Sequence, residues 1–343
     1  MNVNVVMGGP SAEHEISLAT GRGVLQNIDR KKYNARAVVI TRDSKFYYCT
    51  SESVPTPQAL EDPASSPDFT GPVEITQSHS IWQDCDVAFL ALHGEFGEDG
   101  QFQGFLQTIG VAYTGSGVYA SAVGMNKVTI KQLCEKFGLS TPPYTVITSA
   151  DPVQQIDHLI KEHGLPCYVK CPQSGSSRLM GRAGSREELR SLLEEFRDQS
   201  RIILVERAIC GDEYSCPILS RADGTLTALP PILIRPVKGT FFDYEAKYTS
   251  GACEEIVPAP CSQDLTKRIQ DTAAAVHTFL GCRGLSRTDM IHSDNTLYVL
   301  EINTLPGLTG TSLAPKSFSA QGGTYTELLD ILIQNALSDK GQK

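Results

Sequence analysis

Apolar and polar positions alternate in two different ways along the first third of the chain. Short apolar runs are typical of buried strands, while apolar residues that recur every three or four positions are typical of helices. Because strands and helices alternate here, the pattern predicts a parallel sheet covered by helices on both faces. The predicted strands lie at 3–7, 35–40 and 87–92, and the predicted helices lie at 15–26 and 101–109.

Residues 50–80 interrupt this alternation, because they are rich in Pro, Ser and Thr. Such a composition favours turns over regular elements, so we expect a surface loop there. After residue 115 the pattern changes to a mixed and finally antiparallel one, and we expect three units, at 1–115, 116–205 and 206–343. Helices are predicted at 125–137, 185–199, 264–280 and 326–337, and strands at 202–206 and in a hairpin at 285–302.

The hairpin carries the most informative polar residues of the chain. Its turn has the sequence HSDN, and a centre near Asn295 places Arg287 opposite Asn303 and Asp289 opposite Glu301. Residues two apart in a strand point to the same face, so these four side chains share one face. Asp, Glu and Asn offer the hard oxygen ligands that Mg²⁺ prefers. The alternative is an exposed polar face with an Arg–carboxylate pair.

Lysines stand at structured places elsewhere in the chain. Lys127 begins a predicted helix, Lys170 ends a strand, and Lys247 lies in the polar loop 237–255. Gly175–Ser177 follow shortly after Lys170, and small residues let backbone N–H groups approach phosphate oxygens closely. A phosphate-binding loop or an ordinary turn both fit this segment.

The turn between the first strand and the first helix, at 7–18, has an unusual charge. A helix start usually attracts anions. Here Glu13 and Glu15 would repel a phosphate, and taken alone the two carboxylates would only complement the helix dipole.

Composition narrows the class of protein. The 343 residues are 41% hydrophobic and 20% charged, as in ordinary globular proteins, and the net charge of −9 argues against general nucleic-acid binding. No apolar run approaches the roughly 20 residues of a membrane span, and no basic segment followed by an apolar one suggests a secretory signal. The ten cysteines form no Cys-x-x-Cys pair, which favours reduced thiols and a cytoplasmic protein.

Together these motifs resemble the D-alanine–D-alanine ligases of the ATP-grasp superfamily. The matching segments follow the family order at 8–18, 91–127, 169–177, 239–248, 287–290 and 300–313. The resemblance implies an α/β protein in which an N-terminal parallel α/β substrate-binding domain (1–115) precedes a two-subdomain ATP-grasp fold. The central subdomain would be 116–205, and the C-terminal subdomain 206–343 would carry a lid loop at 237–255.

The resemblance also implies an activity and its ligands. Such enzymes use ATP to phosphorylate the carboxylate of one D-alanine, and the amine of a second D-alanine attacks the acyl phosphate to form D-alanyl-D-alanine for peptidoglycan synthesis. Two Mg²⁺ or Mn²⁺ ions, a cytoplasmic location and a homodimer are expected, with no nucleic-acid or membrane partner.

The family roles transfer to this chain residue by residue. Glu15 would bind the first ammonium group with His93 nearby, and Ser176 and Tyr248 would hydrogen-bond with Glu15. Arg287 and the N–H of Gly307 would stabilise the oxyanion, and Ser312 and Leu313 would contact the second carboxylate. The nucleotide would be held by Lys127, Lys170, Gly175, Ser176, Ser177, Glu206, Glu213 and Lys247, and the metal by Asp289, Glu301 and Asn303.

One loop and two single residues depart from the family pattern. The loop 170–180 reads KCPQSGSSRLM where the family usually resembles KPSREGSSVGM, Asn126 stands where Asp is common, and Phe242 replaces a frequent Tyr. Two alternatives therefore stay open: a ligase with another acceptor, such as D-lactate, D-serine or another amino acid, and a nucleotide-binding regulator without turnover. Tyr248 favours the dipeptide-forming members.

Overall fold

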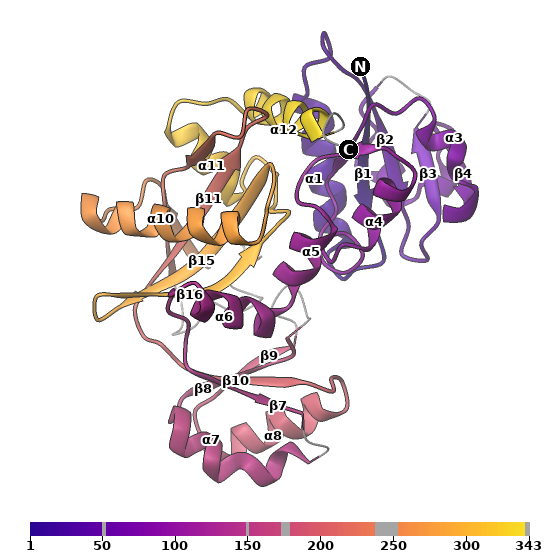
Figure 1. Cartoon of the computed structure of the whole chain (residues 1–343). Helices are drawn as coiled ribbons and strands as arrows, with labels where there is room; N and C mark the ends of the chain where they lie inside the picture. The colour runs from indigo at the N-terminus through magenta and orange to yellow at the C-terminus, as the bar shows by residue number, and fades with distance from the viewer. Residues whose placement is uncertain (50–52, 149–150, 173–178, 237–252, 340–343) are drawn as a thin grey trace.

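The computed structural model describes residues 1–49, 53–148, 151–172, 179–236 and 253–339, and three β-sheets organise them (Figure 1). The N-terminal sheet has the order β4-β3-β2-β1-β5-β6, in which β1, β2, β5 and β6 are parallel and β3 pairs antiparallel with both β2 and β4. Its strands are β1 (Asn2–Gly8), β2 (Asn34–Ile40), β3 (Phe46–Cys49), β4 (Phe69–Val73), β5 (Val87–Leu90) and β6 (Ala112–Tyr113), and its helices are α1 (His14–Asn27), α2 (Pro57–Glu61), α3 (His79–Trp82) and α4 (Gln101–Thr108).

Both faces of this sheet are buried, as the apolar runs predict. Alternate residues of β1 point to opposite sides: Val5 packs in a core with residues of α1, whereas Val6 packs in a second core with Trp82 and Phe102. The prediction of a parallel sheet covered on both faces is confirmed for the four parallel strands.

The expectation of a plain loop at 50–80 is wrong. The described part of this segment contains α2, β4 and two 3₁₀ turns, η1 (Pro63–Ser65) and η2 (Ile75–Gln77). Thr56 accepts a hydrogen bond from the Ala59 N–H and so caps α2, and Leu60 is buried in the core. One capping residue and one apolar anchor are enough to order a short helix in a Pro-rich segment.

The central sheet has the order β7-β10-β8-β9 and is antiparallel throughout. Leu189, Leu193 and Phe196 of its second helix pack against Val169 and Val205 of the strands. Its elements are β7 (Tyr144–Ile147), η3 (Pro152–Gln155), α7 (Ile156–His163), β8 (Cys167–Lys170), β9 (Met180–Ala183), α8 (Arg186–Arg197) and β10 (Ile203–Arg207).

Two helices connect the N-terminal sheet to the central one. The helix predicted at 125–137 is α6 (Lys127–Lys136), and a separate helix that the sequence did not predict, α5 (Val118–Met125), precedes it. Asn126 separates the two, and its side chain accepts hydrogen bonds from the N–H groups of Val128 and Thr129. Lys127 therefore occupies the first turn of a capped helix.

The C-terminal sheet has the order β14-β13-β11-β15-β16, with β12 paired to β11. Met290 and Val299 face a core formed with α10, α5 and α6. Asp289 and Ile291, the neighbours of Met290, point to the opposite face. The elements are β11 (Asp212–Ser220), β12 (Leu226–Ala228), β13 (Ile232–Pro236), β14 (Cys253–Ile256), α10 (Gln263–Phe279), β15 (Leu285–Ser293), β16 (Thr296–Asn303), α11 (Leu313–Ala320) and α12 (Tyr325–Asp339).

The last helix, α12, returns to the beginning of the chain. Leu329 and Ile333 belong to the same core as Val5 of β1, and the Tyr33 hydroxyl donates to Asp330 over 2.5 Å. Figure 1 shows α12 beside α1 and β1. The N-terminal sheet is therefore covered in part by the far end of the sequence.

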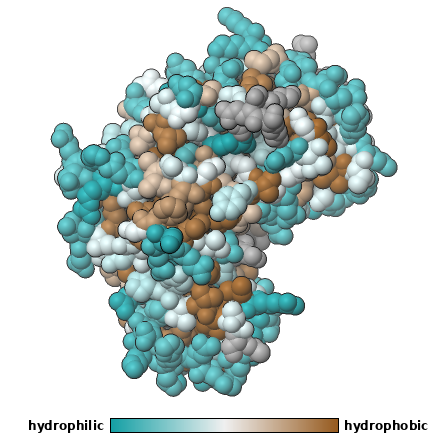
Figure 2. Space-filling model, in the orientation of Figure 1, coloured by the Kyte–Doolittle hydropathy of each residue, from teal (hydrophilic) through white to brown (hydrophobic). Residues whose placement is uncertain are grey.

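The distribution of polar residues on the surface and the burial of the cysteines are typical of a globular protein. In Figure 2 hydrophilic residues dominate the upper and lower ends of the visible face, and apolar residues gather towards its middle. Most of the cysteines are buried. Within the described ranges, no helix has the length and apolar character needed to cross a membrane.

Candidate active site

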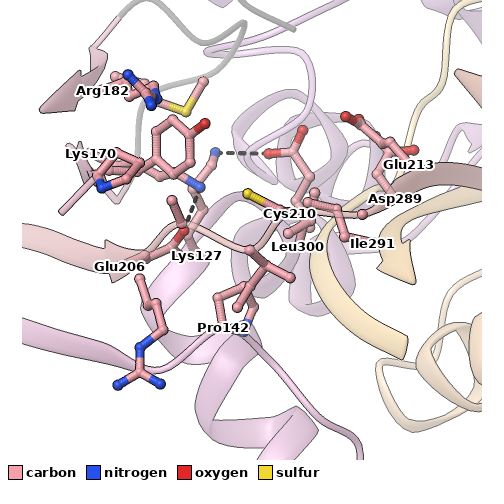
Figure 3. Close-up of a pocket in the computed structure, with 18 of the residues that line it drawn as sticks. Lys127, Pro142, Lys170, Arg182, Glu206, Cys210, Glu213, Asp289, Ile291 and Leu300 are labelled. Carbon is pink, nitrogen blue, oxygen red and sulfur yellow. Dashed lines mark hydrogen bonds and ion pairs between the residues drawn. The ribbon is translucent and has the colours of Figure 1, made fainter. Parts of the chain in front are cut away.

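A cavity of about 530 Å³ lies between the central and C-terminal sheets (Figure 3). One wall comes from β8, β9 and β10 and the other from β11, β15 and β16. Its apolar part includes Leu179, Met180, Ile209, Ile291 and Leu300, while lysines and carboxylates gather elsewhere on the lining. A cavity of this size that combines an apolar part with convergent polar groups is typical of a small-molecule site.

Six of the predicted site residues line this one cavity although they are distant in sequence. They are the two lysines and four carboxylates Lys127, Lys170, Glu206, Glu213, Asp289 and Glu301.

The hairpin presents its polar face to the cavity in the predicted register. Asp289 pairs with Glu301 and Arg287 pairs with Asn303 across β15 and β16. Asp294 and Asn295 form the turn, and both have positive φ (47° and 61°), which short Asx side chains tolerate. The predicted arrangement of the four side chains on one face is confirmed.

Each hairpin carboxylate has a basic partner. Arg287 donates two hydrogen bonds to Asp289, over 3.0 Å from Nε and 2.9 Å from a terminal nitrogen, and Ser215 donates a third. The Lys127 ammonium lies 3.3 Å from a Glu301 oxygen. Two adjacent carboxylates thus coexist because cations flank them.

The same donor set is suited to a divalent cation. Two carboxylates and the Asn303 amide supply oxygen ligands, and Mg²⁺ is commonly held by one or two carboxylates with substrate phosphates completing its shell. Among the described residues no group of three or more His, Cys, Asp or Glu side chains forms a closed metal cage. Two carboxylates and one amide would leave positions on the ion for the oxygens of a phosphorylated ligand.

Glu206 lines the cavity and lies between two lysines. Its carboxylate is 2.6 Å from the Lys170 ammonium and 2.8 Å from that of Lys131. Burial by itself would raise the pKa of Glu206, but the two ammonium groups outweigh that effect and lower it to about 2. Glu206 is therefore an anion at neutral pH.

A second polar cluster lies in the N-terminal unit and faces the hairpin. His93 follows β5, is buried, and has its Nε2 atom 2.9 Å from the Thr20 hydroxyl. Burial lowers the pKa of His93, and the nearby Glu13 carboxylate opposes this shift. Burial also raises the pKa of Glu98 well above its ordinary value, an effect that Glu13 strengthens and Arg287 weakens.

Glu13 and Glu15 differ sharply in position. Glu13 is buried, and a Cβ atom at Gly94 would lie 2.7 Å from its Oε2 atom, so the carboxylate is directed toward the segment that carries His93. Glu15 is exposed and forms an ion pair with Arg42, whose hydrogen bond lowers the pKa of Glu15. The structure thus brings Glu13, and not Glu15, together with His93.

Sequence reasoning did not select Glu13 as a site residue. No local pattern marked it, because the predicted helix began at Glu15, whereas α1 begins at His14 and has Glu13 as its N-cap residue.

The segment after β16 carries the remaining predicted residues. Ser312 is the N-cap residue of α11, Leu313 is its first residue, and a Cβ atom at Gly307 would lie 3.0 Å from Ser312 Oγ. Thr309 N–H donates to Ser312 Oγ over 3.1 Å. Gly307 and Ser312 are therefore neighbours. Gly175, Ser176, Ser177, Lys247, Tyr248 and most of the loop 237–255 lie outside the described residues.

Family models match almost the whole chain. A model described as D-ala D-ala ligase N-terminus matches residues 2–116, and one described as D-ala D-ala ligase C-terminus matches residues 133–334. The D-alanine–D-alanine ligase of Leptospira biflexa is 37% identical and aligns with 98% of this chain and 99% of its own. That of Syntrophobacter fumaroxidans is also 37% identical, over 99% and 98%.

Solved structures resemble the chain over the same extent. The VanG D-Ala:D-Ser ligase from Enterococcus faecalis superposes with a TM-score of 0.85 at 28% identity, covering 98% of this chain and 99% of that one. The D-alanine–D-alanine ligase from Bacillus anthracis complexed with ATP has a TM-score of 0.77 at 30% identity, covering 100% and 99%.

Proposed function

The chain belongs to the D-alanine–D-alanine ligase family, and from this premise we propose how its residues join two D-alanines at the expense of ATP. One D-alanine carboxylate accepts the γ-phosphoryl group, the amine of a second D-alanine attacks the acyl phosphate, and phosphate leaves. The product is D-alanyl-D-alanine for peptidoglycan precursors. The observation that carries the proposal is the convergence of Lys127 and Lys170 with Asp289 and Glu301 in one cavity.

ATP occupies this cavity in the proposal, with its base in the apolar slot beside Glu206 and its ribose near Glu213. Lys127 and Lys170 bind the phosphates. Asp289, Glu301 and Asn303 hold Mg²⁺ or Mn²⁺, which supplies charge neutralisation for phosphoryl transfer. The ion pair of Lys127 with Glu301 keeps both side chains at the phosphate end of the cavity before the nucleotide arrives.

The first D-alanine binds where the N-terminal cluster faces the hairpin. Its ammonium group pairs with the buried carboxylate of Glu13, because Glu15 already pairs with Arg42 at the surface. A buried carboxylate offers a stronger partner for a cation than an exposed one. Burial keeps His93 neutral, so it serves as a hydrogen-bonding group and not as a competing cation.

Arg287 stabilises the oxyanion of the tetrahedral intermediate. Asp289 holds its guanidinium through two hydrogen bonds, which fixes the group before the reaction. A pre-oriented donor of this kind stabilises an oxyanion without reorganisation. The Gly307 N–H would supply a second donor, and Ser312 with the first turn of α11 would receive the carboxylate of the second D-alanine.

The reaction is tested by following ADP release and product mass together. ADP should appear only when D-alanine is present, and the product should be D-alanyl-D-alanine. ADP release without D-alanine, or nucleotide binding without turnover, would contradict the proposal. We also propose a cytoplasmic homodimer, for which light scattering is the direct test.

A second acceptor is favoured by one observation, the TM-score of 0.85 with a D-Ala:D-Ser ligase. Competition between D-alanine and D-serine at equal concentration decides between them. If D-alanyl-D-serine were the main product, D-serine would be the acceptor in place of D-alanine, and the proposed nucleotide site would be unaffected.

A further inference from the structure

Lys131 is an unusual residue of α6, because it is a lysine with only 1% of its surface exposed. Lysine is rarely buried to this extent unless it is paired. Its ammonium lies 2.8 Å from a Glu206 oxygen and donates to the Thr141 hydroxyl over 2.7 Å. It stands four residues after Lys127, on the same side of the helix, but it is not part of the cavity lining.

Glu206 connects Lys131 to the cavity. One of its oxygens faces Lys131 and the other lies 2.6 Å from Lys170. Lys170 lines the cavity directly, while Lys131 lies behind Glu206. Lys131, Glu206 and Lys170 therefore form a row of alternating charges, positive, negative and positive, that runs from the buried Lys131 to the cavity.

The net charge of the cluster of Lys131, Glu206 and Lys170 determines how strongly Lys170 attracts an anionic ligand. Lys170 and Glu206 without Lys131 would form a neutral buried pair, and the carboxylate would compete with a phosphate for the ammonium. With Lys131 present, the cluster carries a net charge of +1 at the wall of the cavity. At low dielectric such a difference acts strongly on a nearby anion.

We propose that Lys131 is a positioning residue of the nucleotide site, which neutralises Glu206 so that the charge of Lys170 is available to the phosphates of the nucleotide. The inference rests on the proposed binding of ATP in this cavity. A purely structural role is the alternative, since Thr141 also donates to Val299 O over 3.1 Å and so links α6 to β16.

The experiment compares the binding of ADP with that of adenosine by calorimetry. Lys131→Met removes the charge and retains most of the apolar volume. Lys136→Met, at an exposed position of the same helix, is the matched control. We expect Lys131→Met to weaken ADP about tenfold and adenosine less than about twofold, and the control to bind both as the wild type does. Equal weakening of ADP and adenosine would assign Lys131 a structural role and overturn the inference.

The double variant Lys131→Met/Glu206→Gln tests the charge count and also serves if the single variant fails to fold. Removing both opposite charges leaves Lys170 with its full charge, so the ratio of ADP to adenosine affinity should equal that of the wild type. A ratio lowered about tenfold in the double variant would overturn the inference, because Glu206 would then not be the group that Lys131 neutralises. Failure of the wild type to bind ADP would instead refute the proposed nucleotide site.

Discussion

Glu301 lies directly opposite Asp289 because Leu300 is an extra residue in β16. Asp289 pairs with Glu301, but the next residue, Met290, pairs with Val299, so the ladder shifts by one position between them. Such bulges are common beside functional sites, where they redirect a side chain. Here the bulge places two carboxylates side by side at the end of the cavity.

Glu301→Gln should nearly abolish turnover while the fold is retained. The substitution removes charge from the proposed metal site but keeps the volume, so we expect kcat to fall by about 100-fold or more. Steady-state kinetics across a Mg²⁺ titration is the measurement. Glu194→Gln, on the exposed face of α8, serves as the control. A near-normal kcat in Glu301→Gln would remove Glu301 from the metal site.

Glu13→Gln and Glu15→Gln form a matched pair that separates two carboxylates in one turn. Losing a buried charge partner costs about 2 kcal/mol or more, so Glu13→Gln should raise the KM for the first D-alanine about 30-fold. Glu15→Gln breaks only an exposed ion pair and should change this KM by less than about twofold. Initial rates at saturating ATP give both values. The reverse order would return the ammonium site to Glu15.

Stability should fall below neutral pH because of His277. This residue is 1% exposed, its Nδ1 lies 2.7 Å from Ser286 Oγ, and burial lowers its pKa to about 4. The unfolded chain binds the proton near pH 6.5, well before the folded chain does. The stabilising contribution is therefore complete above pH 6.5 and is lost as pH falls toward 4, by about 3 kcal/mol.

Urea unfolding at pH 7.5 and 5.0 measures this loss. His277→Leu should reduce the difference between the two midpoints, whereas His79→Gln, at an exposed position, should leave it as in the wild type. An unchanged difference in His277→Leu would assign the acid sensitivity to other groups.

Asn126→Ala should destabilise the protein by about 1 kcal/mol, because two N–H groups of α6 lose their side-chain acceptor. Asn126→Asp keeps an acceptor and should stay within about 0.5 kcal/mol of the wild type. Equilibrium urea unfolding gives both values. If alanine were neutral, water would satisfy the helix start as well as Asn126 does.

The hairpin shows which features of the site the sequence could predict and which it could not. A turn centred between Asp294 and Asn295 would by itself place Leu300 opposite Asp289. The predicted pair with Glu301 exists because the bulge compensates for that half-residue error. The alternation of polar residues in both strands pointed to the correct face. Nothing in the local sequence marks Leu300 as the extra residue, since bulges depend on how the sheet packs.

The carboxylates of the first turn show a different limit of prediction from sequence. Glu13 and Glu15 are equally polar and only two residues apart, so local pattern cannot distinguish them. Their positions depend on contacts that are distant in sequence, Gly94 for Glu13 and Arg42 for Glu15. Helix α5 was missed because its residues, VYASAVGM, are mostly small or apolar and have no amphipathic period.

The return of α12 to the first sheet has a consequence for biosynthesis. One face of that sheet packs against Leu329 and Ile333, which leave the ribosome some 300 residues after β1. Domains usually fold from the N-terminus as they are translated. Helix α1 covers this face early, but the part that packs against Leu329 and Ile333 stays uncovered until α12 has been translated. We expect the nascent N-terminal segment to depend on chaperones until the last helix emerges.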